Sequence, residues 1–138
     1  MTGNVKDIIT ISFASVGAVL GVINTVHAFN QDRLRLIIRA KHAYFVPYGV
    51  PGAKMGSIEV ISLSAFPVFV SEIGFKIPNQ TDRLVITQPI TGDGLQFARR
   101  LEPRQSISGY FDLPNSSSPL GKSYARTDCD EWIHGNSL

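Results

Sequence analysis

The sequence predicts an all-β domain, an antiparallel β-sandwich, preceded by one N-terminal transmembrane α-helix. Residues 8–29 contain no Asp, Glu, Lys or Arg, whereas charged residues recur every few positions through most of the remainder. From residue 33 onward, short apolar segments alternate with Pro, Gly, Asn and Asp at intervals of roughly 8 to 12 residues, which is typical of antiparallel sheets. A chain of 138 residues has room for one domain and an anchor, so two catalytic domains that share a cleft are excluded.

The uncharged run from Ile8 to Phe29 is long enough to cross a bilayer as a helix. At 1.5 Å per residue it spans about 33 Å, against a hydrocarbon core of about 30 Å. Its Ser and Thr hydroxyls can bond back to helix carbonyls. We expect a flank at 1–7, the transmembrane helix at 8–29 and a linker at 30–32. Two alternatives stay open: a buried core helix, which is usually shorter, and a signal peptide cleaved after Ala28. The methionine at position 1 favours an uncleaved anchor.

Small residues recur one turn apart inside this predicted helix. Gly17 and Gly21 form a GxxxG step, and Ala14 and Ala18 form a second small pair at the same spacing. Small side chains one turn apart let two helix backbones approach closely in lipid. We interpret these residues as helix packing positions, although glycine is also tolerated in membrane helices without a packing role.

Basic residues are concentrated after the run. One basic residue, Lys6, precedes it, and four follow within about a dozen positions: Arg33, Arg35, Arg39 and Lys41. Lys and Arg excess marks the cytoplasmic side, which places the C-terminal domain in the cytoplasm. The single cysteine, Cys129, agrees with a reducing compartment because it cannot form an intrachain disulfide.

The same four basic residues alternate with apolar residues, which predicts a strand with one buried face. A helix that continues out of the bilayer is the alternative. We expect the basic row to contact anionic headgroups, at about 1 kcal/mol per residue. Two other interpretations are that the row only sets topology, or that it contacts nucleic acid. The last is disfavoured because no recognised nucleic-acid motif accompanies it.

The predicted sandwich covers residues 33–134 and is followed by a tail at 135–138. Residues 46–56 and the polar segment 114–123 are expected to be loops, and residues 127–132 form a tight turn into a last edge strand around Trp132. About seven short strands are expected, because each strand has one apolar face and requires a facing sheet. They lie at 33–45, 57–64, 66–78, 84–90, 95–101, 105–114 and 122–128, together with the last edge strand.

Several segments, in order, resemble a known group of proteins: SIEVISLSAFPVFVSEIGF, LEPRQSISGYFDL and YARTDCDEW, after a membrane span and a basic strand. The chain resembles small bacterial and phage membrane proteins that carry one membrane helix and an immunoglobulin-like β-sandwich, mostly without an assigned function. The residues that match are Leu101, Pro103, Ser106, Tyr124, Asp128 and Trp132. The resemblance implies an immunoglobulin-like fold and no catalytic residue.

The sequence contains no pattern typical of catalysis or metal binding. The histidines are scattered, and Cys129 lies between Asp128 and Asp130, whose negative charges disfavour a reactive thiolate. No catalytic residue, metal or cofactor is expected. We therefore expect a noncatalytic, single-pass structural or protein-interaction module of the inner (cytoplasmic) membrane. Its partners would be the bilayer and a protein, either a second copy or a capsid protein. The alternatives are a virion component in the internal membrane of a lipid-containing phage, and an accessory subunit of an enzyme.

Overall fold

The computed structural model describes residues 2–46, 52–114 and 119–138. The chain divides into two compact units, Met1–Arg33 and Leu34–Leu138, which are described separately. The first contains one helix and the second contains only strands and their connections within the described residues. The structure therefore confirms the predicted order of an apolar helix followed by antiparallel β-sheets.

The helix α1 spans Thr2–Gln31. It includes residues 2–7 and 30–31, which the sequence assigned to a flank and a linker, because each residue added to an established helix gains a backbone hydrogen bond. Its hydroxyl groups bond to carbonyl oxygens one turn earlier, as predicted. Thr10 Oγ1 donates to Lys6 O at 2.9 Å, and Thr25 Oγ1 donates to Gly21 O at 2.8 Å.

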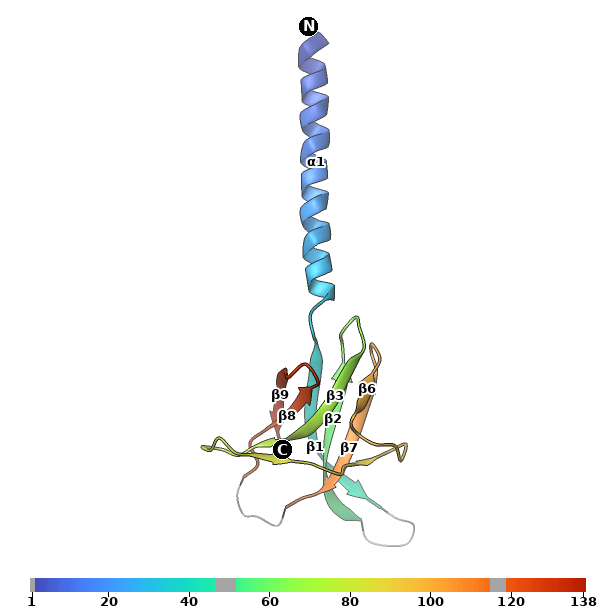
Figure 1. Ribbon diagram of the computed structural model, residues 1–138, viewed down its shortest axis with the longest axis vertical. Helices are drawn as coiled ribbons and strands as arrows, with labels where there is room; N and C mark the ends of the chain where they lie inside the picture. Colours follow the sequence, from blue (N-terminus) through green and yellow to red (C-terminus); the bar gives the residue numbers. More distant parts are fainter. Residues whose placement is uncertain (1, 47–51, 115–118) are drawn as a thin grey trace. The chain divides into compact units, whose positions relative to one another are not determined.

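The second unit contains nine strands in its described residues. They are β1 (Leu36–Phe45), β2 (Ala53–Ser62), β3 (Val68–Lys76), β4 (Arg83–Val85), β5 (Ile90–Thr91), β6 (Arg99–Leu101), β7 (Ser106–Asp112), β8 (Lys122–Thr127) and β9 (Trp132–Ser137). All described pairs are antiparallel. One sheet has the order β1-β2-β7-β5, and the other has the order β4-β3-β8-β9, with β6 also paired to β3 (Figure 1).

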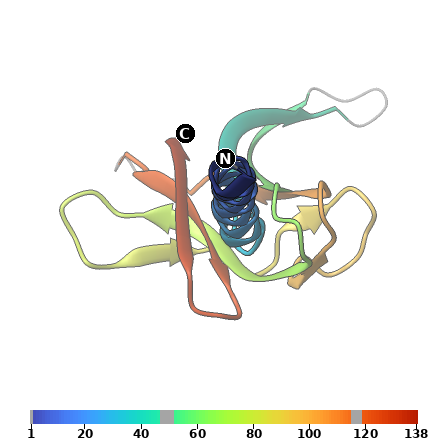
Figure 2. The ribbon, with the colours of Figure 1, turned by 90° about the horizontal axis from the view of Figure 1, so that it is seen from above.

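The two sheets share one hydrophobic core. Phe75 of β3 and Phe111 of β7 pack across it with ring centroids 5.7 Å apart. The alternation predicted for the first strand is confirmed, because Leu36, Ile38 and Ala40 are buried while Arg35, Arg39 and Lys41 are exposed. From above, the β3–β4 and β8–β9 hairpins lie on one side of the view and the β5–β6 connection on the other (Figure 2).

A side chain joins the two sheets where β1 lies beside β9. Asn136 Nδ2 donates to Ala40 O at 2.9 Å, and Asn136 Oδ1 accepts from Ala40 N at 2.7 Å. The amide therefore satisfies a backbone donor and acceptor as another strand would. A β-carbon at Gly135 would collide with the carbonyl oxygen of Ile38, so this close approach requires glycine.

Four sequence assignments differ from the structure. Residues 53–56, expected in a loop, belong to β2; the earlier part of that loop, 47–51, lies outside the described residues, as do 115–118 of the polar segment. The strand expected at 84–90 divides into β4 and β5, which lie in different sheets, because the chain crosses the core between them. Of the strand expected at 95–101, only the last three residues are extended and paired. The expected tail belongs to β9 through Ser137, because the Asn136 bonds hold it.

Candidate interaction surfaces

The surface of α1 is apolar over most of its circumference. Gly3–Gln31 is a candidate membrane span by length and composition: it contains an 18-residue window with a mean hydropathy of 1.9, and no residue of that window is buried. Large apolar side chains along it are 49% exposed at the least, at Ile9, and 76% at the most, at Phe13. An apolar surface of this length requires an apolar environment from outside the helix.

The predicted packing positions lie on one side of α1. At 100° per residue, Ala14, Gly17, Ala18 and Gly21 fall within an arc of about 100°. A β-carbon at Gly17 or Gly21 would meet no atom within 4 Å beyond its chain neighbours and the backbone of its own helix. The strip of helix surface formed by these four residues, which we call the helix stripe, is therefore exposed. No second helix occurs in the described part of the chain.

The predicted basic row is only partly on a strand. Arg33 and Arg35 precede β1, whereas Arg39 and Lys41 lie on it, and all of them are exposed. Lys41 Nζ lies 2.9 Å from Glu59 Oε2 on the neighbouring strand β2. The three arginines form no ion pair with another described residue, so their charges are available to a ligand.

A second cluster, which the sequence did not single out, lies on the outer face of the sheet β4-β3-β8-β9. Its centre is Glu72 of β3, which is flanked by Arg126 of β8 in the strand register. Tyr124 Oη donates to Glu72 Oε1 at 2.6 Å, and Arg83 Nε of β4 lies 3.1 Å from the same oxygen. We call the surface formed by Glu72, Arg83, Tyr124, Arg126 and Trp132 the Trp132 face.

Trp132 on β9 is held between aromatic and cationic neighbours. Its ring centroid lies 5.1 Å from that of Tyr124. The Cζ atoms of Arg83 and Arg126 lie 4.6 Å and 5.4 Å from the tryptophan ring centroid, within the range of cation–π contact. Arg126 Nε also donates to Asp130 Oδ1 at 2.8 Å. The indole is thus oriented while 37% of the residue stays exposed.

Local backbone features of β3 explain how these side chains meet. A register shift between Val70 and Glu72 redirects the strand, so that Glu72 lies on the outer face while Ile73 points into the core. Gly74 follows on the outer face, and a β-carbon there would come within 2.8 Å of Tyr124 Oη. Glycine therefore leaves room for the tyrosine to lie across the strand.

Burial raises the pKa of Tyr124 well above its ordinary value, and the hydrogen bond to the Glu72 carboxylate raises that pKa further. Tyr124 is 1% exposed, so ionisation would place a second negative charge beside Glu72 away from water. The phenol consequently acts as a hydrogen-bond donor that holds the carboxylate in place.

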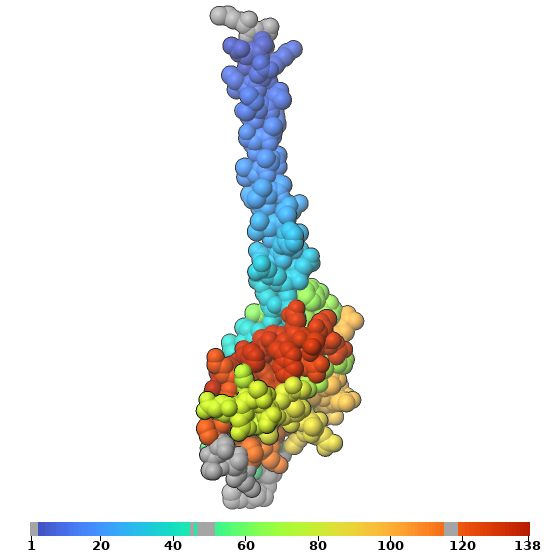
Figure 3. Space-filling model, turned by 60° about the vertical axis from the view of Figure 1, so that its left-hand side comes forward, coloured from blue at the N-terminus to red at the C-terminus, as the bar shows by residue number. Residues whose placement is uncertain are grey.

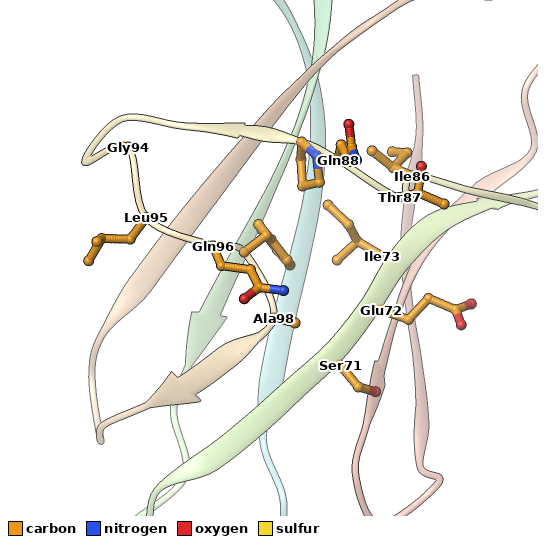
Figure 4. A pocket seen from close by; sticks show the side chains of 12 residues that line it. Ser71, Glu72, Ile73, Ile86, Thr87, Gln88, Gly94, Leu95, Gln96 and Ala98 are labelled. Atoms are coloured by element: carbon orange, nitrogen blue, oxygen red, sulfur yellow. The ribbon is translucent and has the colours of Figure 1, made fainter.

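A cavity of about 410 Å³ lies between β3 and the segments on either side of β5 (Figure 4). Its lining includes Ile73 and Phe97 together with the polar residues Thr87, Gln88 and Gln96. Glu72 also borders it, but its carboxylate is bonded to Tyr124 on the neighbouring strand. Hydroxyl and amide groups over an apolar floor could hydrogen-bond a small uncharged ligand.

A second cavity, of about 400 Å³, has a more apolar lining that includes Tyr44, Met55, Ile90 and Tyr110. Across residues 2–46, 52–114 and 119–138, no group of three or more His, Cys, Asp or Glu side chains is placed to hold a metal ion.

Sequence reasoning missed the Trp132 face because its members come from four strands. Glu72 is the one signal that was available: it is the only acidic residue in the apolar segment 66–78. A charged residue in such a segment needs a partner, but the sequence cannot say which basic residue the register supplies.

Comparison of the chain with protein-family models, with curated proteins and with solved structures finds no match in any of the three.

Proposed function

We propose that the protein is a noncatalytic, single-pass membrane-anchored module whose sheet domain acts by protein interaction. The observation that carries the proposal is the contrast in α1: large apolar side chains are at least 49% exposed over the whole helix, while the sheet domain has a complete core of its own. The buried residues of that core all come from the sheet domain itself. Lipid is the environment that would cover the exposed apolar side chains of α1.

We propose that the sheet domain is an immunoglobulin-like sandwich. The order β1-β2-β7-β5 corresponds to strands A-B-E-D of that fold, and β3-β8-β9 corresponds to C-F-G. β4 then takes the place of an additional strand beside C. The hallmark intersheet disulfide has no counterpart because the chain has one cysteine, and the shared apolar core supplies the stability instead.

The basic residues after α1 support a cytoplasmic position for the sheet domain. Arg33 and Arg35 follow the end of the helix by only a few residues, so the chain itself holds them near the membrane surface. We propose that they and Arg39 contact anionic headgroups, whereas Lys41 is engaged by Glu59. Ala14, Gly17, Ala18 and Gly21 would pack against a second helix in the bilayer.

The test is membrane fractionation of the full chain. We expect the protein to stay in the pellet after alkaline carbonate extraction, with a mass that includes residues 1–28. Release by carbonate overturns the anchor, and a mass that begins at Phe29 identifies a signal peptide instead.

Topology is tested at Cys129, which is exposed. A membrane-impermeant maleimide should label it after lysis and not in intact cells. Labelling in intact cells would overturn the cytoplasmic placement. The helix stripe is tested by Gly17→Ile with Gly21→Ile: crosslinked dimer in membranes should fall, and unchanged dimer would remove the packing role.

A further inference from the structure

Four charges along β3, β8 and the β8–β9 turn are separated by sign around the Trp132 face, although Asp82 of the β3–β4 turn lies at the basic end and Arg100, paired with Glu102, lies near the acidic end. Lys76 and Lys122 lie at one end, on the outer sides of β3 and β8, and both are exposed. Asp128 and Glu131 lie at the other end, in the turn that joins β8 to β9, and are also exposed. None of the four forms an ion pair with another described residue. Along β8 the two ends are about 20 Å apart, at about 3.3 Å per residue.

Between these ends the face carries exposed apolar and aromatic surface. Trp132 is 37% exposed, Val85 of β4 is 38% exposed and Phe69 of β3 is 40% exposed. Trp and Arg are the residues most enriched among those that dominate binding energy at interfaces. Here the tryptophan is already oriented by Arg83 and Arg126, so little side-chain entropy remains to be lost on binding. Figure 3 shows the red C-terminal strands beside the yellow-green β3–β4 region on one surface.

We infer that the Trp132 face pairs with the same face of a second copy of this chain. A partner of uniform charge would match only one end of the face. A second copy matches both ends if the two copies are related by a two-fold axis that lies in the interface and runs across the strands. Asp128 and Glu131 of the second copy then meet Lys76 and Lys122 of the first, and by symmetry the lysines of the second copy meet the acidic residues of the first. The tryptophans then lie near the axis, where water is excluded from both.

This contact names a partner for the interaction role proposed above and rests on that role. Self-association through the Trp132 face is measured in detergent solution, whereas membrane anchoring is measured by fractionation. Either proposal can therefore fail without the other. Helix packing is a separate route to a dimer. The measurements are therefore made with the natural helix and also with Gly17→Ile and Gly21→Ile.

The test is a charge exchange in the full-length chain. One variant carries Lys76→Glu and Lys122→Glu, and the other carries Asp128→Lys and Glu131→Lys. Each alone brings like charges together twice in the symmetric dimer, so we expect self-association, followed by light scattering over a concentration series, to weaken at least about tenfold. Mixed in equal amounts, the two variants face each other with opposite charges at both ends. We expect a heterodimer within about threefold of the wild-type affinity.

The matched control reverses two exposed charges away from the face, Lys54→Glu and Arg104→Glu, and should leave association unchanged. Tryptophan fluorescence checks that each variant is folded. A wild-type chain that stays monomeric throughout the series overturns the inference. So does a mixture of the two variants that forms no heterodimer, or a dimer that is lost with the helix substitutions and insensitive to both charge reversals.

Discussion

The helix and the sheet domain use the same apolar residue types in opposite environments. Ile11 and Phe13 of α1 are 65% and 76% exposed, whereas Ile73 and Phe75 of β3 are fully buried. Apolar burial is favourable by roughly 25 cal/mol per Å² removed from water. The sheet domain obtains this contribution from its own chain, whereas the large apolar side chains of the helix are exposed.

The polar groups of the two regions differ in the same way. Hydroxyl groups in α1 bond to carbonyls four residues earlier in the sequence. In the sheets, Asn136 bonds to Ala40 and Tyr124 bonds to Glu72, which are far apart in the sequence. These hydroxyl groups of the helix are satisfied locally, whereas the polar side chains of the sheet domain depend on tertiary contacts.

The largest expected effect comes from charge in the helix. Val19→Lys with Leu20→Lys should remove the protein from the carbonate-resistant membrane fraction, because each charge near the bilayer centre costs about 2.5–3.5 kcal/mol. The matched control places lysine at Leu63 and Phe66, which are exposed apolar residues of the sheet domain. That control should fractionate as wild type. Equal behaviour of the two variants would contradict the difference between the regions.

A truncation in the core should come next. Ile58→Ala removes a fully buried side chain of β2 and should lower the free energy of unfolding by about 2–5 kcal/mol. Ile23 of α1 is 58% exposed, so Ile23→Ala should change the free energy of unfolding by no more than about 0.5 kcal/mol. Urea titration in detergent, followed by the fluorescence of the single tryptophan, measures both. A larger loss for the helix variant would show that α1 packs on the folded domain.

The β1–β9 junction should give a smaller loss. Asn136→Ala leaves the N–H and C=O of Ala40 without their partner, which should cost about 1–3 kcal/mol in the same titration. Ser137→Ala, at the neighbouring exposed residue, is the control. An unchanged midpoint for the asparagine variant would mean that water replaces the amide without loss.

The smallest effect concerns Tyr124, whose pKa is raised in the folded state. The folded protein then retains this proton above pH of about 10, where an unfolded tyrosine loses it. The contribution of protonated Tyr124 to the free energy of unfolding is fully present below pH of about 10 and is lost as the pH rises through the folded-state pKa. Tyr124→Phe should cost about 1 kcal/mol at neutral pH and flatten the alkaline loss. In an ultraviolet titration, the wild type should show an ionisation above pH of about 10 that Tyr124→Phe lacks, and identical titration curves above that pH would contradict the raised pKa of Tyr124.

The sequence determined those features that depend on neighbouring residues. The uncharged run from Ile8 to Phe29 predicted α1, and alternation around Ile38 predicted the buried face of β1, because helix and strand periodicities are local. The turn before Trp132 also followed from local residue types. Two other features depend on contacts between residues far apart in the sequence. Residues 84–90 divide between two sheets, and residues 135–137 belong to β9 and not to a free tail.

Only the tertiary structure decided which side chains meet. Glu72, Arg83, Tyr124 and Trp132 come together because the register of β3, β8 and β9 and one bulge bring them to the same outer face. A shift of one residue in any of these strands would send its side chain to the opposite face. The sequence alone therefore supplied the candidate anchor and the basic row beside it, whereas the Trp132 face exists only through strand pairing.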